Sequence, residues 1–594
     1  MTEIVRKVAV PVLRVAGLGG FALAITCFVP LNCNSLGVPA GRTLLWMAAI
    51  AGPLGWTNWQ AARLLLQTAG WRVPLRSVRY GLQCAVCALA VACTGAFGLV
   101  VVICVPQLLD HAYPFAVVFA LLSLPPLVLH RVRAVYEPVL RGRAIRPRLE
   151  AGLDAMWLQA DDDDGLPWGG WQVPTPGASL HFAVVGRTGS GKSLLMRLLE
   201  AAVLPRVGTA DIRALVYDAK TDAVSRLLAM CGHSVKILHP FDARGVAWDI
   251  AGDCTSTAAA IQVTETLIER RDEGANNYFS DAARDLTSGV MISLMRTAGR
   301  HWTFRDVLVI VRDRDLLVQV LGRCEETRDR LQHLKEERTA QAVISTLLTR
   351  LAPYVPIAAA WEHAADRVSA ADWAAGRTVL VLGNDEAARG PVDAINRALF
   401  GLCVNNTLAG PERRGPSHWF FLDEVREAGR LDGLGSLLTK GRSKGAAVVL
   451  GFQDIEGLWS VYGDREANEL VGQCASKALL GIDSPSTAEW ASAVIGQVER
   501  QEVKTSTGSG GTTLSYERVK REGVLASEFH ALPPANLADG LTGFFTYPGV
   551  GAYRGRFSGA DLTRAAKLTE AGPAFVPRPA WQQILRPWCD ADAI

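Results

Sequence analysis

The stretch GRTGSGKS, residues 186–193, decides the fold of this chain. It follows the apolar run HFAVV at residues 181–185 and precedes the helical pattern LLMRLLEAAV. A glycine-rich turn between a strand and a helix binds phosphate, because its backbone N–H groups can surround phosphate oxygens. The sequence therefore predicts a P-loop for ATP and Mg²⁺, formed by Gly186, Arg187, Thr188, Gly189, Ser190, Gly191, Lys192 and Ser193.

Two residues of this loop and two acidic residues downstream make up the predicted catalytic centre. Lys192 is expected to reach the β and γ phosphates, and Ser193 to offer its hydroxyl to Mg²⁺. A P-loop also needs a second strand that ends in a carboxylate, and HWFFLDEV supplies Asp423, expected to hold Mg²⁺ through water. Glu424 is then placed to polarise the attacking water. Acidic residues after a strand also occur as plain helix N-terminal charges, but the upstream P-loop favours catalysis.

The apolar run AAVVLGF, residues 446–452, ends abruptly on Gln453. If this strand lies beside the one that ends at Asp423, Gln453 reaches the edge of the sheet where phosphate binds. In RecA-like motors a polar residue at this place contacts the γ-phosphate or its water, and it can transmit the loss of that contact to the elements that hold DNA. The alternative is a strand-ending polar residue that faces solvent.

Immediately before that strand stands the basic turn KGRSKG, residues 440–445. P-loop ATPases that are slow alone need an arginine from a neighbour to neutralise charge in the transition state. Arg442 is the candidate for this arginine finger, and the assignment implies a ring of subunits. The alternative is a solvated basic turn.

The apolar runs of the chain indicate an α/β fold. Continuous rather than alternating apolarity is typical of strands covered on both faces, hence of a mostly parallel sheet flanked by helices. The predicted strands span residues 181–185, 214–218, 378–382, 418–422, 446–452 and 477–482.

A long segment without strand character, roughly residues 295–367, predicts an all-helical domain inserted into the α/β core. Capping boxes of Thr303 with Asp306 and of Ser369 with Asp372 mark two helix starts. The Gly/Ser/Thr-rich segment at residues 504–522 predicts a hairpin with basic flanks. The expected domains are a transmembrane region at 1–135, a nucleotide-binding domain at 136–295 and 368–565, an all-α domain at 296–367 and a C-terminal tail at 566–594.

Four uncharged stretches near the start predict membrane helices, each close to or above the roughly 17–25 residues that cross a bilayer. They are Val15–Leu31, Thr43–Ala62, Gly81–Leu109 and Ala112–Leu129, and nothing comparable follows Arg131. A secretory signal peptide would have one such stretch. Arginines flank these stretches on one side, which predicts a cytoplasmic amino end, a cytoplasmic middle loop and a cytoplasmic chain after Leu129.

Composition limits the remaining possibilities. At 594 residues the chain exceeds one compact domain, and its net charge of +3 means that any nucleic-acid partner must be held by a local basic surface. The twelve cysteines show no metal-ligand spacing. Cys84 and Cys87 have CxxC spacing but lie in an apolar stretch without a second pair. We therefore expect no disulfide framework and no zinc site.

The motifs together resemble those of the type IV secretion coupling proteins of the TraD/TrwB kind. Besides the P-loop they are YDAKTD followed by HPFDARGVAWDI, then FFLDEV, LLTKGRSKGAAVVLGFQDIEGLWSVYG and ASEFHALPP. The resemblance covers most of the chain beyond residue 150, and the block from Phe420 to Gly463 is its most specific part. By position in these motifs, Lys192, Ser193, Asp423, Glu424, Arg442 and Gln453 inherit the roles given above, while Asp218 and Lys220 match a D-x-K motif without a defined role.

The resemblance implies a homo-hexameric, RecA-like ATPase that translocates DNA, either single- or double-stranded. It implies a multi-pass protein of the bacterial inner membrane, with a cytoplasmic motor, that links relaxase-bound DNA to the proteins of a type IV secretion channel. Two features depart from the family: members commonly carry two membrane helices, and the long acidic tail of some members is missing. About thirty residues follow Leu562.

Other functions remain open at this point. The chain could be a docking receptor that selects relaxase or effector protein and whose ATPase gates the channel. An FtsK-like chromosome translocase has four membrane helices too, but places a winged-helix module after its motor. An ABC exporter is disfavoured because no LSGGQ-like signature precedes Asp423.

Overall fold

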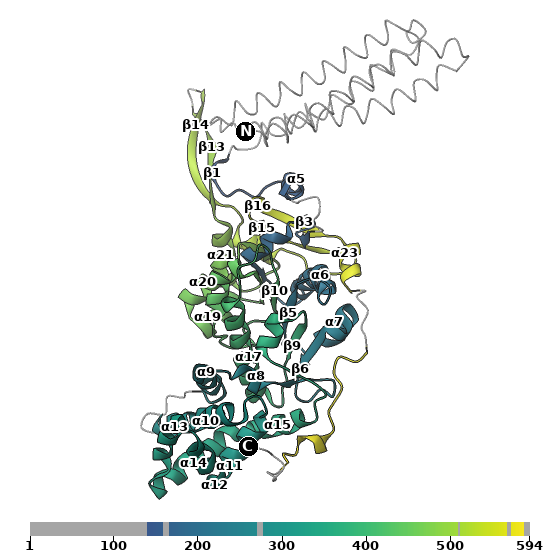
Figure 1. Ribbon diagram of the computed structural model, residues 1–594. Helices are drawn as coiled ribbons and strands as arrows, with labels where there is room; N and C mark the ends of the chain where they lie inside the picture. The colour runs from purple at the N-terminus through teal and green to yellow at the C-terminus, as the bar shows by residue number, and fades with distance from the viewer. Residues whose placement is uncertain (1–138, 159–164, 270–276, 509–510, 567–571, 587–594) are drawn as a thin grey trace, which may run out of the picture. The chain divides into compact units, whose positions relative to one another are not determined.

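The computed structural model describes residues 139–158, 165–269, 277–508, 511–566 and 572–586. Their centre is a nine-stranded sheet in the order β16–β15–β12–β4–β11–β10–β5–β9–β6, with helices on both faces (Figure 1). The strands are β4 (Phe182–Val185), β5 (Arg213–Asp218), β6 (Val235–Leu238), β9 (Val379–Gly383), β10 (His418–Leu422), β11 (Ala446–Phe452), β12 (Ser476–Leu479), β15 (Leu541–Tyr547) and β16 (Gly551–Phe557). The predicted membrane stretches lie outside the described residues.

The expectation of an α/β fold with a mostly parallel sheet is confirmed. All strands from β12 across to β6 run parallel, whereas β15 and β16 pair antiparallel at one edge. Each predicted strand is present, although β12 ends at Leu479, earlier than predicted. The sequence missed β6 because it is short, and β15 and β16 because glycines and polar residues interrupt their apolar runs.

Alternate residues of each central strand enter separate cores on the two faces of the sheet. In β10, Trp419 and Phe421 face the helices α6 (Lys192–Val203) and α7 (Ala223–Cys231). Phe420 and Leu422 face the opposite core. Helices of that second layer include α9 (Thr257–Leu267), α16 (Ala370–Ala375), α17 (Arg389–Ala409), α18 (Leu434–Lys440), α19 (Ile455–Tyr462) and α20 (Asp464–Gln473). Burial on both faces explains why these strands lack polar alternation.

A helical segment is inserted between two short strands, β7 (Ala247–Trp248) and β8 (Arg367–Val368), which pair in parallel. Its main helices are α10 (Asn277–Ala298), α11 (Phe304–Arg312), α12 (Arg314–Arg323), α14 (Glu337–Leu351) and α15 (Val355–Glu362), at the lower end of Figure 1. The capping box of Thr303 and Asp306 is present. The domain boundary predicted at residue 296 falls inside α10, because the helical run already begins with α8 (Ile250–Asp253).

Among the described residues one helical run, Glu337–Glu362, is long and apolar enough to cross a membrane. The sequence predicts no stretch of this kind after Arg131, and this criterion finds one. Its side chains Val343, Leu347 and Ile357 are fully buried in the core.

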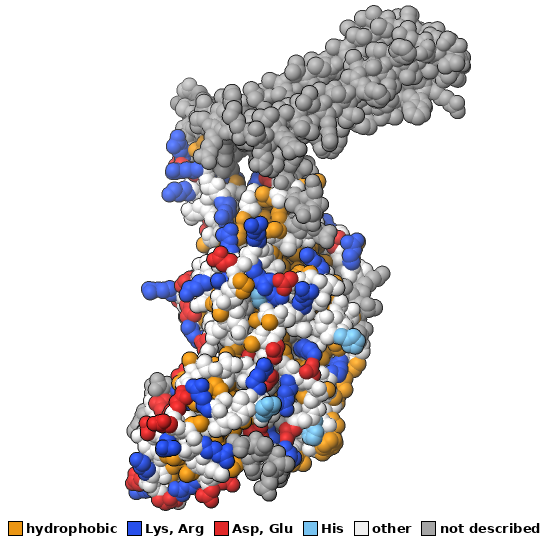
Figure 2. Space-filling view, in the orientation of Figure 1, with side chains coloured by type: hydrophobic (Ala, Val, Ile, Leu, Met, Phe, Trp, Pro, Cys, Tyr) orange, Lys and Arg blue, Asp and Glu red, His pale blue; other side chains and the backbone are white. Residues whose placement is uncertain are grey.

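The predicted hairpin is present and longer than expected, with β13 (Gln497–Gly508) and β14 (Gly511–Glu522). A third strand, β1 (Val139–Gly142), pairs antiparallel with β13. Figure 2 shows lysine and arginine side chains along this hairpin, and an even mixture of both charges over the helical segment. The exposed residues Arg518 and Lys520 belong to β14.

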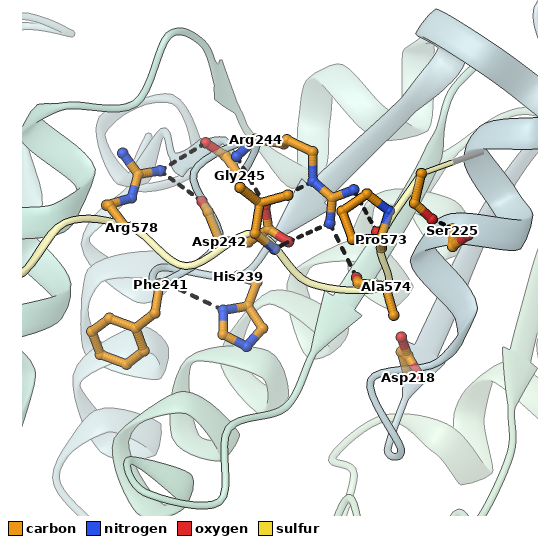
Figure 3. A network of polar contacts seen from close by, with 12 residues as sticks. Asp218, Ser225, His239, Phe241, Asp242, Arg244, Gly245, Pro573, Ala574 and Arg578 are labelled. Carbon is orange, nitrogen blue, oxygen red and sulfur yellow. Dashed lines mark hydrogen bonds and ion pairs between the residues drawn. The ribbon is translucent and has the colours of Figure 1, made fainter. Parts of the chain in front are cut away.

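The C-terminal residues Gly572–Arg586, here called the C-terminal strap, run along the loop that follows β6 (Figure 3). The guanidinium of Arg578 is buried and donates to the carbonyl oxygens of Pro240, Asp242 and Gly245 at 2.9, 3.0 and 3.2 Å. From the other side, Arg244 donates to the strap carbonyls of Pro573 and Ala574, at 2.9 and 3.0 Å. The strap therefore fastens the loop between β6 and β7.

Candidate nucleotide-binding site

The P-loop lies at the carboxyl ends of the central strands, between β11 and β12. The N–H of Gly186 donates to the carbonyl of Phe452 at 3.2 Å, and the N–H of Arg187 to that of Gly481 at 2.8 Å. The guanidinium of Arg187 also pairs with Asp483. The loop is thus fixed to both neighbouring strands before any ligand binds.

Glycine is required in the loop for two reasons. Gly189 and Gly191 have φ angles of 80° and 95°, a region that L side chains rarely adopt. A Cβ on Gly191 would also lie 2.3 Å from Cδ1 of Leu541. The loop can therefore keep its backbone close to a phosphate only with these residues.

Lys192 and Ser193 begin α6 and meet the predicted carboxylates. The Lys192 side chain is 5 % exposed, and its Nζ lies 2.6 Å from Oδ1 of Asp423 and 2.7 Å from Oε1 of Glu424. The hydroxyl of Ser193 donates to Oδ2 of Asp423 at 3.0 Å. The structure therefore brings all four predicted catalytic residues into one cluster.

Asp423 is held in its ionised form. Burial alone would raise its pKa, but the charge and hydrogen bond of Lys192, with Lys220 and Ser193, lower the pKa below its usual value. A hydroxyl and an ionised carboxylate side by side are hard oxygen ligands, which suit Mg²⁺. Among the described residues there is no cluster of three or more His, Cys, Asp or Glu that could hold a metal ion. The donor set therefore fits a Mg²⁺ ion that keeps waters and phosphate oxygens as its other ligands.

Glu424 sits in a strained turn directly after β10. Its φ is 53°, and its side chain is 10 % exposed. The backbone N–H of Glu424 donates to Oδ1 of Asp423 at 3.0 Å, and that of Val425 to the carbonyl of Gly451 at 2.9 Å. These contacts turn the Glu424 carboxylate toward Lys192 rather than along the strand direction.

Gln453 lies at the sheet edge that the sequence predicts, and there it contacts Glu424, a partner that the sequence does not predict. β10 and β11 pair in parallel, with Leu422 opposite Leu450. The amide Nε2 of Gln453 donates to Oε1 of Glu424 at 3.0 Å. The alternative, in which Gln453 only faces solvent, does not describe the whole environment of this residue. Gln453 is exposed, but its side chain is also hydrogen-bonded to Glu424.

Asp218 and Lys220, which the sequence leaves without a role, lie at the same edge of the sheet. Lys220 Nζ is 3.3 Å from Oε1 of Glu424 and 3.9 Å from Oδ2 of Asp423. Asp218 ends β5, and burial raises its pKa to about 6 although the N–H groups of Ala223 and Asp222 oppose this. Lys220 follows the predicted strand that ends at residue 218, and this position was the signal in the sequence that could have placed it at the phosphate-binding edge.

Arg442 does not join the cluster. It lies exposed in the 3-10 turn Gly441–Lys444, at the amino end of β11. Gln453 follows the other end of this seven-residue strand, so the two ends lie about 20 Å apart at the usual rise per residue. Within its own chain Arg442 is therefore too far from the P-loop to act there.

A charged cavity beside the cluster was missed from sequence. Its wall includes Glu200 of α6, which is 4 % exposed and pairs with Arg226 of α7 at 3.1 Å. Burial raises the pKa of Glu200 to about 7, although Arg226 opposes the shift. The signal was the helical spacing of Ser193, Arg197 and Glu200, which places all three on the face of α6 that borders the cavity.

Comparison with known proteins gives a consistent result. The chain is 23 % identical over 415 residues to the coupling protein TraD of Escherichia coli strain K12, covering 67 % of this chain and 54 % of TraD. The chain thus spans about half the length of that relative. The fold is similar to an unbound form of the bacterial conjugative coupling protein TrwB, with a TM-score of 0.60 and 21 % identity over 75 % of this chain and 97 % of TrwB.

A second TrwB structure, in complex with ADP and Mg²⁺, matches with a TM-score of 0.58 and 21 % identity, over 75 % of this chain and 99 % of that one. These likenesses show that the α/β core has the RecA-like fold. The family model of the type IV secretion-system coupling protein DNA-binding domain matches residues 168–546, which include the P-loop and the acidic pair. This chain belongs to the family of type IV secretion-system coupling proteins.

Proposed function

We propose that this protein is a P-loop ATPase that hydrolyses ATP with Mg²⁺ to drive the transfer of DNA into a type IV secretion channel. In this proposal it works as a homo-hexamer in the bacterial inner membrane, anchored by the apolar stretches before residue 130. Its cargo is DNA bound by a relaxase, and its docking partners are the proteins of the channel.

One observation carries the proposal: Lys192, Ser193, Asp423 and Glu424 converge at the carboxyl edge of a parallel sheet. Ligands of open α/β sheets bind at this edge. Lys192 is buried between two carboxylates, and a bound nucleotide would offer its phosphates as further partners for the amine. The site therefore has the charge and donors for a Mg²⁺–nucleotide complex.

Each residue has a defined task in hydrolysis. Lys192 would bind the β and γ phosphates, and Ser193 and Asp423 would hold Mg²⁺ with its waters. Mg²⁺ bound there supplies positive charge to the phosphate oxygens. Glu424 would accept the proton of the attacking water, with Gln453 orienting the carboxylate through its hydrogen bond.

The relatives support the DNA and nucleotide parts of the proposal. The matching family model describes a DNA-binding domain, and TrwB has been crystallised with ADP and Mg²⁺. Because acidic and basic side chains are mixed over much of the visible surface, DNA would contact a local basic patch rather than the whole face (Figure 2).

Two substitutions test the ATPase assignment. Lys192→Ala should abolish hydrolysis and greatly weaken ATP binding, whereas Glu424→Gln should lower hydrolysis by about a hundredfold or more with ATP binding retained. The exposed Lys335→Ala serves as the control. Equal loss of ATP affinity in both variants would refute these roles. In donor cells, Lys192→Ala should also stop DNA transfer, and continued transfer would refute the pump in favour of a receptor.

A further inference from the structure

Lys220 reaches the catalytic carboxylate from a part of the chain that belongs neither to the P-loop nor to β10. It lies two residues after β5, and its Nζ is 3.3 Å from Oε1 of Glu424. The same carboxylate oxygen lies 2.7 Å from Lys192 Nζ and 3.0 Å from Gln453 Nε2. Three nitrogen donors from three different strand ends therefore surround one oxygen of Glu424.

The turn that carries Lys220 is fixed on both sides. The carboxylate of Asp218 is 3 % exposed and accepts from the N–H groups of Asp222 and Ala223, at 3.2 and 3.0 Å, across the first turn of α7. Thr221 is held at a φ of 55°. Arg197 of the P-loop helix pairs with Asp222 at 3.0 Å and ties this turn to α6. Lys220 is thereby presented to the sheet edge by a rigid turn.

Stability does not account for this arrangement. The Lys220 side chain is half exposed, and an ion pair of that kind contributes little to folding. Nevertheless the buried Asp218 and the strained backbone of Thr221 both serve to shape the turn. The arrangement is explained by the contact that the turn gives Lys220 with the Glu424 carboxylate.

Binding of nucleotide changes the partners of Glu424. In the proposed mechanism Lys192 is recruited by the β and γ phosphates, so its hold on Glu424 weakens. Lys220 and Gln453 then remain as the donors to Oε1, and Lys220 is the one that carries charge. A carboxylate held by an ion pair and a hydrogen bond keeps its orientation, and a general base must lie within hydrogen-bond reach of the water proton that it accepts.

We propose that Lys220 is a positioning residue that keeps the Glu424 carboxylate aimed at the attacking water once Lys192 is engaged by phosphate. The inference rests on the proposed ATPase function and deepens it. It predicts that loss of Lys220 slows the chemical step, with ATP binding largely unchanged.

The test uses the full chain with ATP, Mg²⁺ and DNA, and compares Lys220→Met, Lys220→Arg and the exposed control Lys335→Met. Lys220→Met should lower kcat by about 10- to 100-fold, since general-base catalysis is worth about 10²–10⁴. KM should change by less than about threefold, because a group that acts only on the chemical step leaves ground-state binding intact. Lys220→Arg keeps the charge and should recover most of the rate.

The split between kcat and KM separates positioning from a merely structural role. The turn that carries Lys220 is tied to the P-loop helix through Arg197 and Asp222, so a variant that distorts this turn should weaken ATP binding as well. Loss of a contact that only positions Glu424 should lower kcat and leave KM unchanged. Recovery of kcat in Lys220→Arg then assigns the effect to the cation beside Glu424.

Three results would overturn the inference: a kcat of Lys220→Met equal to that of the parent, a lower kcat that Lys220→Arg does not restore, or a loss confined to KM. The Lys192→Ala and Glu424→Gln variants show whether a negative result concerns the ATPase assignment or only the role of Lys220. If they hydrolyse ATP normally, the ATPase assignment is wrong. If they are inactive while Lys220→Met is normal, only the role of Lys220 is wrong.

Discussion

Gln453 Nε2 donates to Oε1 of Glu424 at 3.0 Å, although the two residues lie in different strand-to-helix connections. Glu424 follows β10, and Gln453 follows β11, its parallel neighbour. Directly after Gln453, Asp454 caps α19 by accepting from the N–H of Gly457 at 2.6 Å. A change at Glu424 on hydrolysis can therefore reach α19 through two adjacent residues.

This relationship predicts that Gln453→Ala separates basal hydrolysis from its stimulation by DNA. ATP affinity should stay within about threefold of the parent, because Gln453 contacts Glu424 rather than the P-loop. Stimulation by DNA should be lost before basal turnover. The variant removes the contact between Glu424 and the residue that precedes α19, whereas Lys192 and Lys220 still contact Glu424. Both rates are measured by phosphate release with and without DNA.

The exposed Gln473→Ala, at the end of α20, is the matched control for this variant. Full stimulation by DNA in Gln453→Ala would show that Gln453 is only a polar strand end.

The P-loop and the acidic pair were predictable because their chemistry follows from local order in the chain. A strand, a glycine turn and a helix fix the positions of Lys192 and Ser193 with no long-range information. Asp423 and Glu424 were predictable for the same reason, since an apolar strand places them at the carboxyl edge. Gln453 needed only one further assumption, that β11 pairs beside β10, and that assumption is confirmed.

Lys220 and the start of the helical insertion were not predictable in the same way. The contact of Lys220 with Glu424 depends on β5 lying directly beside β10, and no local pattern encodes that order. Apolar periodicity likewise does not show that the insertion begins before α10, because α9, which lies between β7 and β8 in sequence, packs in the same core as the helices that cover the sheet. This assignment depends on the pairing of β7 with β8, which are more than a hundred residues apart in sequence.

The C-terminal strap provides a prediction about stability. Arg578→Ala would leave the carbonyls of Pro240 and Gly245 without the donor they have here, at a cost of about 1–3 kcal/mol for each unsatisfied group, whereas the Asp242 carbonyl keeps the N–H of Gly245. We expect the strap to detach rather than the sheet to unfold. Hydrogen exchange should then show lost protection at the amides of Ala243 and Arg578, which bond Val576 and Phe241.

The control for the strap is Arg554→Ala, which removes an exposed guanidinium from β16. Unchanged protection of Ala243 in the Arg578→Ala variant would mean that the strap is held without this arginine.

His181 predicts a pH dependence of folding. Its ring is buried, accepts from the N–H of Val448 at 3.2 Å and lies 3.0 Å from the carbonyl of Leu438, so the neutral ring satisfies both partners. Burial lowers its pKa to about 4, although the Leu438 contact opposes this. Between pH 6.5 and pH 4, His181 is protonated in the unfolded chain but stays neutral in the folded chain. Stability is therefore lost as pH falls from 6.5 to 4, by up to about 3 kcal/mol.

The variant His181→Gln can keep both hydrogen bonds but does not titrate. Its free energy of unfolding, from urea titrations at pH 7 and pH 4, should fall less over this interval than that of the parent. The exposed His301→Gln is the control. Equal losses in the parent and in His181→Gln would show that His181 takes up its proton in the folded state as well.

The last prediction concerns Arg442, which is exposed at the amino end of β11 and about 20 Å from the P-loop of its own chain. If it acts as an arginine finger, it completes a site on the neighbouring subunit. Arg442→Ala alone should then lower hydrolysis by about a thousandfold or more, since such a finger is worth about 10³–10⁵, with ATP affinity retained.

Mixed rings test whether Arg442 acts across a subunit boundary. When an Arg442→Ala chain lies beside a Lys192→Ala chain, one arrangement joins an intact P-loop to an intact neighbouring arginine, so some sites become whole. Mixtures of these two inactive variants should recover hydrolysis. Glu424→Gln mixed with Lys192→Ala should not, because both residues serve the same subunit's site. If the first mixture recovers nothing while light scattering shows mixed hexamers, the finger assignment is wrong and Arg442 is a solvated basic residue.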